Sequence, residues 1–171
     1  IQGAIDAAND GDMISVAGGK YHEHIIVNKV VVLSGKKGTT IDGNGTGTVI
    51  SVTRDNVEIN GFTIQNGYRG IFLSDSIGSI SQNNTLISHT EAAIELWYSN
   101  ETIISGNRVS NSDHAIYLLY SSCYNTISDN IVTNNSQGLP LSWHCNGNTI
   151  VGNTVTSNSF ADIVLGGNND N

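Results

Sequence analysis

Residues 70–158 repeat one pattern four times: GIFLSDSIGSISQNNTLIS at 70–88, AIELWYSNETIISGNRVSN at 93–111, AIYLLYSSCYNTISDNIVTN at 115–134 and GLPLSWHCNGNTIVGNTVTS at 138–157. Each copy begins at a Gly or an Ala, and the step from one copy to the next is nearly constant. A fixed period of this length is typical of solenoid proteins. One such unit cannot bury its own apolar face, so neighbouring units must stack to form a core.

Apolar residues alternate with other residues inside each copy, as in Ile94 and Leu96 or Ile116 and Leu118. Short strands joined by tight turns have this period of two, whereas paired helices need an apolar residue every three to four positions. We therefore predict an all-β, single-stranded parallel β-helix with about 22–23 residues per rung. Each rung has two or three short strands, and each strand pairs with its equivalent one rung later.

An asparagine column accompanies the apolar pattern, with the same step between successive members. Asparagine tolerates the left-handed backbone of a tight turn. Its amide can also bond to the equivalent amide in the next rung, about 4.8 Å away. We expect a structural ladder formed by Asn84, Asn107, Asn130 and Asn153.

The chain is predicted to form one domain over residues 1–171. Residues 1–10 have helical apolar spacing and are expected to cap the first rung. Residues 11–48 are expected to form irregular first rungs, with one strand over 21–27. Regular rungs are expected over 49–171, and the absence of a recognisable C-terminal cap predicts an open last rung.

The charge balance excludes some classes of partner. The chain has 15 acidic and 7 basic residues, a net charge of −8, and no basic cluster beyond Lys36 and Lys37. Nucleic acids need clustered Lys and Arg, so none is expected to bind. The longest apolar run, 25–33, is too short to span a membrane. We expect an extracellular or cell-surface location and interpret the sequence as a piece of a larger secreted polypeptide.

Several motifs resemble a known repeat family: GDMI at 11–14, GKY at 19–21, IDGNG at 41–45, NTISDN at 125–130 and NTIVGN at 148–153. They look like the NosD-type, pectate-lyase-like family of right-handed parallel β-helix repeats. The resemblance implies the fold and an archaeal or bacterial surface setting. It leaves the function open, because the family includes copper-loading accessory proteins, polysaccharide-active enzymes and surface proteins.

The outward positions of each copy's first strand offer one candidate acid–base set. Glu95 and Tyr117 are expected on adjacent rungs, with His114 at the edge of its rung. The motifs of calcium-dependent lyases, of hydrolases with paired Asp residues and of uronate epimerases do not occur. A surface Glu–Tyr pair without catalytic function is the alternative reading.

An aromatic column is the clearest candidate binding feature. Tyr98, Tyr120 and Trp143 occupy the same place in three successive copies, and Trp97 and Tyr117 lie close by. Aromatic side chains on a solenoid face can bind sugar rings, form a protein contact or pack at a corner. The sequence leaves these three interpretations open.

Metal binding has weaker support. A strand over 21–27 would place His22 and His24 on one face, and imidazole is a ligand for copper and zinc. Two histidines make an incomplete site, so no cofactor is expected, with calcium or copper as the alternative.

Two cysteines and four glycosylation sequons complete the candidate sites. Cys123 and Cys145 lie almost one repeat apart, so an inter-rung disulfide and two buried thiols are equally compatible with the sequence. Asn-x-Ser/Thr sequons, which also arise by chance in such a composition, occur at Asn44, Asn83, Asn100 and Asn134.

These observations favour an extracellular structural or binding module. Its expected partners are surface glycans or further copies of itself, assembled end to end or laterally. A carbohydrate-active enzyme of the lyase, epimerase or hydrolase type is the first alternative. A copper-binding accessory protein is the second.

Overall fold

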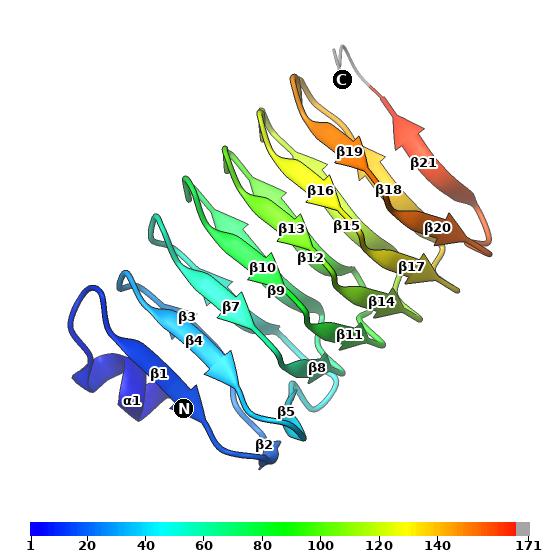
Figure 1. Cartoon of the computed structure of the whole chain (residues 1–171). Coiled ribbons are helices and arrows are strands. Elements are labelled where there is room, and N and C mark those ends of the chain that lie inside the picture. Colours follow the sequence, from blue (N-terminus) through cyan, green and yellow to red (C-terminus); the bar gives the residue numbers. More distant parts are fainter. Residues whose placement is uncertain (167–171) are drawn as a thin grey trace.

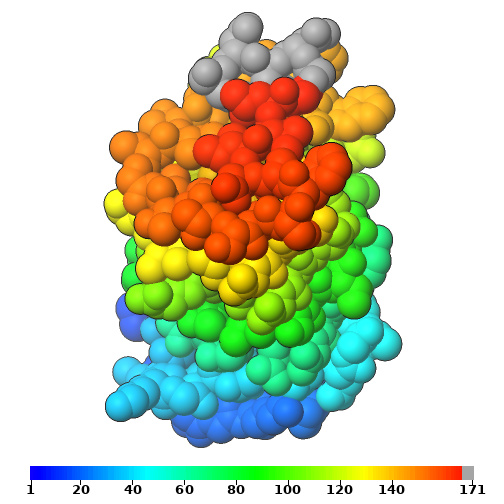
Figure 2. Space-filling view, turned by 90° about the vertical axis from the view of Figure 1, so that its right-hand side faces the viewer, coloured from blue at the N-terminus to red at the C-terminus, as the bar shows by residue number. Residues whose placement is uncertain are grey.

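The computed structural model describes residues 1–166 as a parallel β-helix with three strands in each rung (Figure 1). Each of the three parallel sheets has seven strands, and neighbours within a sheet are one rung apart in the sequence. The space-filling view shows the rungs as successive layers that follow the order of the sequence (Figure 2). The predicted fold class is therefore confirmed, and the choice between two and three strands per rung is settled as three.

The chain enters each rung through sheet A, continues through sheet B and leaves through sheet C. Sheet A contains β1 Met13–Val16, β4 Val32–Gly35, β7 Glu58–Asn60, β10 Ile80–Gln82, β13 Ile103–Ser105, β16 Thr126–Ser128 and β19 Thr149–Val151. Sheet B contains β2 Gly19–Tyr21, β5 Thr39–Asp42, β8 Thr63–Gln65, β11 Thr85–Ile87, β14 Arg108–Ser110, β17 Ile131–Thr133 and β20 Thr154–Thr156. Sheet C contains β3 Ile25–Val27, β6 Thr48–Val52, β9 Arg69–Ser74, β12 Ala92–Trp97, β15 His114–Leu119, β18 Gln137–Leu141 and β21 Ala161–Leu165.

The core consists of aliphatic columns that run along the solenoid axis. Alternate residues of a strand point inward, and the register places like residues over one another. Ile94, for example, pairs with Ile71 on one side and Ile116 on the other. All three are fully buried. The sequence period is therefore the length of one rung, and it sets this register.

The first rungs are irregular in length but regular in pairing. Met13 of β1 pairs with Val32, which pairs in turn with Glu58, so the first rung is shorter and the second longer than the later repeats. The strand expected over 21–27 is interrupted, because residues 22–24 form the turn between β2 and β3.

The sequence predicts a helical cap at the N-terminal end of the solenoid and an open rung at the C-terminal end. The helix α1, Gln2–Ala7, packs Ile5 into the core and so forms the expected cap. The chain end at which an open last rung was expected, 167–171, lies outside the described residues. Among residues 1–166 no helix is long and apolar enough to cross a membrane.

Asn84, Asn107, Asn130 and Asn153 form the predicted ladder at the corner between sheets A and B. The side-chain oxygen of each member from Asn107 onward accepts hydrogen bonds from the backbone N–H and the side-chain amide of the preceding member, at 2.9–3.2 Å. Phe62 takes the same place one rung earlier, and its N–H donates to Asn84 Oδ1. The column therefore satisfies buried backbone groups that the strands leave unpaired.

The expected left-handed backbone of the ladder residues is wrong. Positive φ occurs at the residue that precedes each ladder member: 54° at Asn83, 63° at Gly106, 56° at Asp129 and 68° at Gly152. Turn formation and amide bonding are thus divided between two adjacent positions. The ladder asparagine is used for its hydrogen bonds.

Two further ladders occupy the other corners. Between sheets C and A, Asn125 Nδ2 donates to Asn148 Oδ1 at 3.0 Å. Between sheets B and C, Asn135 Oδ1 accepts from the N–H of Ser112, whose hydroxyl oxygen accepts from the N–H of His89. Each corner of the solenoid thus has its own internal polar column.

His89 occupies the place of a ladder residue as a buried, neutral imidazole. Nδ1 accepts from the N–H of Gly67 at 3.3 Å, which leaves Nε2–H to donate to the carbonyl of Ile64 at 3.2 Å. Burial lowers the pKa of His89 to about 4, because the charged ring would be desolvated. Protonation would also remove the acceptor for Gly67.

We expect the stability to fall as the pH falls from about 6.5, the ordinary pKa of histidine in the unfolded chain, to about 4. Above that window His89 is neutral in both the folded and the unfolded chain. The neutral, buried imidazole then makes its full contribution of about 3 kcal/mol to the free energy of unfolding. Urea denaturation at several pH values measures the slope. His89→Asn, which matches the residue type at Asn135, is the control and should flatten the curve between pH 6.5 and 4. Equal slopes for the two proteins would contradict this assignment.

Candidate binding surface

Three aromatic residues stack along the corner where the chain leaves sheet C. Tyr98 and Tyr120 directly follow Trp97 and Leu119, the paired last residues of β12 and β15. Trp143 lies two residues after Leu141, the last residue of β18, which pairs with Leu118. The ring centroids of Tyr98 and Tyr120 lie 5.6 Å apart with nearly parallel planes, and those of Tyr120 and Trp143 lie 5.8 Å apart. Tyr98 is 53% exposed and Trp143 is 59% exposed. We call these three residues the aromatic corner.

The backbone at the aromatic corner has positive φ angles of 48° at Tyr98, 50° at Tyr120 and 63° at Trp143. Bulky residues seldom adopt this conformation, which Gly, Asn and Asp adopt more readily. The preceding rung has Asp75 at the same place, with φ of 53°. Three aromatic residues therefore occupy positions that would be less strained with another residue type.

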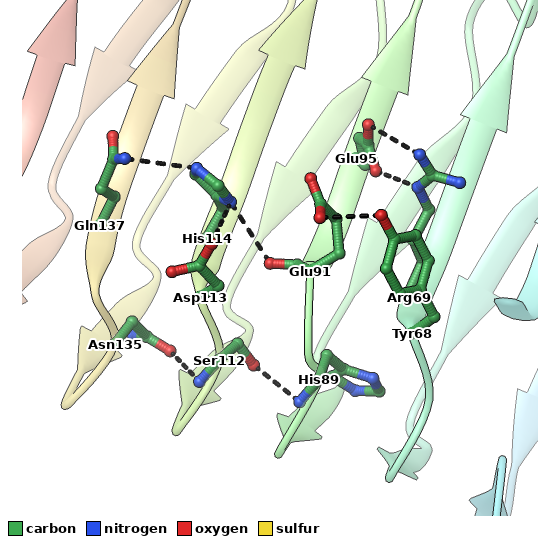
Figure 3. A network of polar contacts seen from close by, with 10 residues as sticks. All are labelled: Tyr68, Arg69, His89, Glu91, Glu95, Ser112, Asp113, His114, Asn135 and Gln137. Carbon is green, nitrogen blue, oxygen red and sulfur yellow. Dashed lines mark hydrogen bonds and ion pairs between the residues drawn. The ribbon is translucent and has the colours of Figure 1, made fainter. Parts of the chain in front are cut away.

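A buried ion pair between Arg69 and Glu95 lies on the outer face of sheet C (Figure 3). It is close to the aromatic corner, because the ring centroids of Trp97 and Tyr120 are 5.2 Å apart. Glu95 is only 1% exposed, and its carboxylate accepts hydrogen bonds from Arg69 Nε and from Trp97 Nε1, the latter at 2.6 Å. The Arg69 guanidinium lies 4.7–5.2 Å from the ring centroids of Tyr68, Phe72 and Trp97. The carboxylate is thus neutralised by a cation that aromatic rings shield from water.

Polar contacts continue along the same face toward the C-terminal rungs. The hydroxyl of Tyr68 donates to Glu91 at 2.9 Å, and the Gln137 amide contacts His114 Nε2 at 3.3 Å (Figure 3). The ring of His114 stacks on Tyr117, with centroids 4.5 Å apart. The pKa of Tyr117 is raised, first by burial and then by the negative charges of Glu95 and Glu91. This phenol is therefore protonated at neutral pH.

The structure brings the sequence-predicted acid–base residues together. Glu95 and Tyr117 are direct cross-strand neighbours, and His114 contacts Tyr117. The burial of Glu95 and its pairing with Arg69 do not favour it as a general acid or base, because a substrate needs access to the carboxylate. The catalytic role of these residues stays a prediction.

His22 and His24 flank Glu23 in the turn between β2 and β3. The His24 Nδ1 lies 2.9 Å from the carbonyl of Thr48. The carboxylate of Glu23 accepts hydrogen bonds at 2.8 Å from the amino group of Ile1. The strand geometry that motivated a metal site is thus absent, and the acid between the two imidazoles is already paired.

Cys123 and Cys145 are thiols in the structure. Cys123 Sγ accepts from the N–H of Asn146 and donates to the carbonyl of His144, both at 3.2 Å. Burial raises the pKa of Cys145 to about 11, so this thiol is unreactive at neutral pH. The inter-rung disulfide stays a prediction.

Sequence reasoning missed Arg69, the partner of Glu95. The two residues are separated by one rung and a few further positions, so they share no column in the repeat. A usable signal was the presence of a cation at the start of β9, one rung before an outward-facing acid. Tyr68 and Glu91 were also missed. They lie 23 residues apart and so share a column, but the two residues differ in type.

Comparisons with known proteins identify a family, a relative and a solved structure of similar fold. A family model described as "Periplasmic copper-binding protein (NosD)" matches residues 5–171. A "Cell surface glycoprotein" of Methanothermus fervidus is 36% identical over 89 residues, which cover 50% of this chain and 15% of that protein. The pectin methylesterase from Yersinia enterocolitica superposes with a TM-score of 0.55 at 17% identity over 97% of this chain and 69% of that chain. The last likeness concerns the fold alone.

The residues present do not fit the copper named in that family description. Over residues 1–166 no group of three or more His, Cys, Asp or Glu side chains could hold a metal ion. The one methionine, Met13, is an exposed residue of the first rung.

Proposed function

The chain belongs to the NosD family, and we propose that it is a cell-surface module that binds neutral glycans at its aromatic corner. The surface location follows the name of the relative from Methanothermus fervidus. The chain covers 15% of the length of that relative. The activity and partners of a whole protein of that kind are thus part of the proposal.

The proposal depends most on one observation: Tyr98, Tyr120 and Trp143 combine a left-handed backbone with ring-to-ring contacts along successive rungs. Residues held in such strained positions cost free energy and are concentrated at functional sites. Packing alone does not account for the arrangement, since Tyr98 and Trp143 are more than half exposed. A ligand that contacts the rings would explain why aromatic residues are kept there.

The ligand chemistry follows from the shape and charge of this surface. The rings recur once per rung, so a linear polymer parallel to the solenoid axis would meet one ring after another. Tyr and Trp combine apolar faces with a polar group, which suits sugar rings with their C–H faces and hydroxyls. The net charge of −8 favours a neutral glycan over a polyuronate.

Replacing Tyr98 or Trp143 with Asn is expected to weaken glycan binding by about tenfold, the loss of about 1.4 kcal/mol of ring contact. The stability should stay unchanged or rise, because Asn tolerates positive φ. A soluble panel of cellohexaose, chitohexaose and polygalacturonate, followed by calorimetry on the tightest ligand, provides the measurement.

Tyr124→Asn is the matched control. Tyr124 is 68% exposed, has φ of 58° and makes no contact with another aromatic ring within residues 1–166, so its replacement should leave binding unchanged. A loss of stability in Tyr98→Asn without any bound glycan would indicate a packing role. Concentration-dependent dimers that this substitution abolishes would indicate a contact between copies instead.

A further inference from the structure

The four sequons differ in how the fold presents them. Asn44, Gly45 and Thr46 all lie exposed in the loop 43–47, between β5 and β6. Asn44 has φ of 52°, and its side-chain amide has no hydrogen-bond partner within residues 1–166. The space around the Cα of Gly45 is open. This sequon is therefore accessible over its whole length.

The sequons at Asn83 and Asn134 are only half accessible. Both asparagines are exposed, but the middle residue of each sequon is a buried ladder member, Asn84 or Asn135. The ladder bonds of Asn84 include Nδ2 to the carbonyl of Ile59 at 3.0 Å. An enzyme that must grip three consecutive residues would have to pull a ladder residue out of the core.

The sequon at Asn100 is blocked at its other end. Asn100 Oδ1 accepts from the N–H of Cys123 at 2.7 Å. Thr102, whose hydroxyl defines the sequon, is fully buried, and its oxygen has no partner among residues 1–166. This hydroxyl cannot be recognised while the rung is folded.

We propose that Asn44 is the residue at which the folded domain accepts an N-linked glycan. The donor is an oligosaccharide joined to a lipid phosphate or diphosphate. The bond between Asn44 Nδ2 and the anomeric carbon forms, and the bond from that carbon to the phosphate oxygen breaks. The lipid phosphate leaves with the electron pair, and Nδ2 loses one proton. The proposal rests on the surface location proposed above, where such modification occurs.

The loop is built to display this side chain without disturbing the rungs. The backbone N–H of Asn44 donates to Asp42 Oδ1 at 2.9 Å, and that of Gly45 donates to the carbonyl of Asn66 at 2.7 Å. The Thr46 hydroxyl makes only a long 3.4 Å contact with the carbonyl of Gly43. The loop lies at the corner between sheets B and C, so a glycan here leaves the aromatic corner uncovered.

The test compares the folded chain with unfolded acceptors. The purified, unmodified protein and four synthetic peptides (residues 40–48, 79–87, 96–104 and 130–138) are incubated with an oligosaccharyltransferase and a lipid-diphosphate-linked oligosaccharide. Glycopeptide mass spectrometry then locates the product. We expect every peptide to be modified and the folded protein to be modified at Asn44 at least tenfold faster than at the other sequons.

Three variants, each lacking the hydroxyl residue of one sequon, test which sequon is modified. Thr46→Ala should abolish modification of the folded protein, whereas Thr85→Ala and Ser136→Ala should leave it unchanged. Comparable rates at Asn83 or Asn134, or failure at Asn44 in the protein or in its peptide, would overturn the proposal. Tyr98→Asn should accept the glycan at the unchanged rate, so this proposal and the binding function can fail separately.

Discussion

Arg69→Met is expected to lower the free energy of unfolding by about 3 kcal/mol, near the lower end of the range for breaking a buried ion pair. The substitution leaves the Glu95 carboxylate, 1% exposed, with Trp97 Nε1 as its remaining side-chain donor. The Arg69 side chain is 19% exposed, so water can partly replace it beside Glu95, which reduces the loss of stability. Urea denaturation at neutral pH gives the free energy.

The double variant Arg69→Met, Glu95→Leu should recover most of that loss, because it removes the uncompensated charge together with its partner. Arg108→Met is the matched control. Arg108 is exposed on β14 and forms no ion pair within residues 1–166, so its replacement should cost less than about 0.5 kcal/mol. A loss below about 1 kcal/mol for Arg69→Met would mean that water already compensates the carboxylate.

The fold could be predicted from the repeat because one period encodes three properties. Ile94 and Leu96 recur as a pair in the neighbouring copies, which sets the strand, its inward face and its register together. The asparagine column could be predicted because a single residue type repeats at a constant step. The first rungs were harder to place, since one is shorter and the next is longer than the later repeats, which hides the period.

The site could be predicted only where it follows the repeat. The aromatic corner was found because Tyr98, Tyr120 and Trp143 share one column. The column between sheets B and C was missed because its members, among them His89, Ser112 and Asn135, differ in residue type. The positive φ angles of the three aromatic residues could not be predicted, because bulky residues seldom adopt this conformation.

Asn130→Leu is expected to lower the free energy of unfolding by about 3 kcal/mol. The substitution leaves one buried backbone N–H without its acceptor and one buried backbone carbonyl without its donor. Asn130 Oδ1 accepts from the N–H of Asn107 at 2.9 Å, and its Nδ2 donates to the carbonyl of Ile104 at 2.9 Å. Leucine has a similar volume, so the lost hydrogen bonds account for most of the effect. Urea denaturation gives the change in the free energy of unfolding.

Asn153→Leu tests whether burial determines how much a ladder residue contributes to stability. Asn153 has the same role one rung later, but it is half-buried, so water can replace the bond it offers to Asn130. We expect a smaller cost of about 1 kcal/mol. Because the left-handed residue of each turn precedes the ladder member, neither substitution disturbs the turn itself. Equal losses at the two positions would mean that burial does not govern the ladder, and a negligible loss at Asn130 would mean that its bonds contribute nothing net to stability.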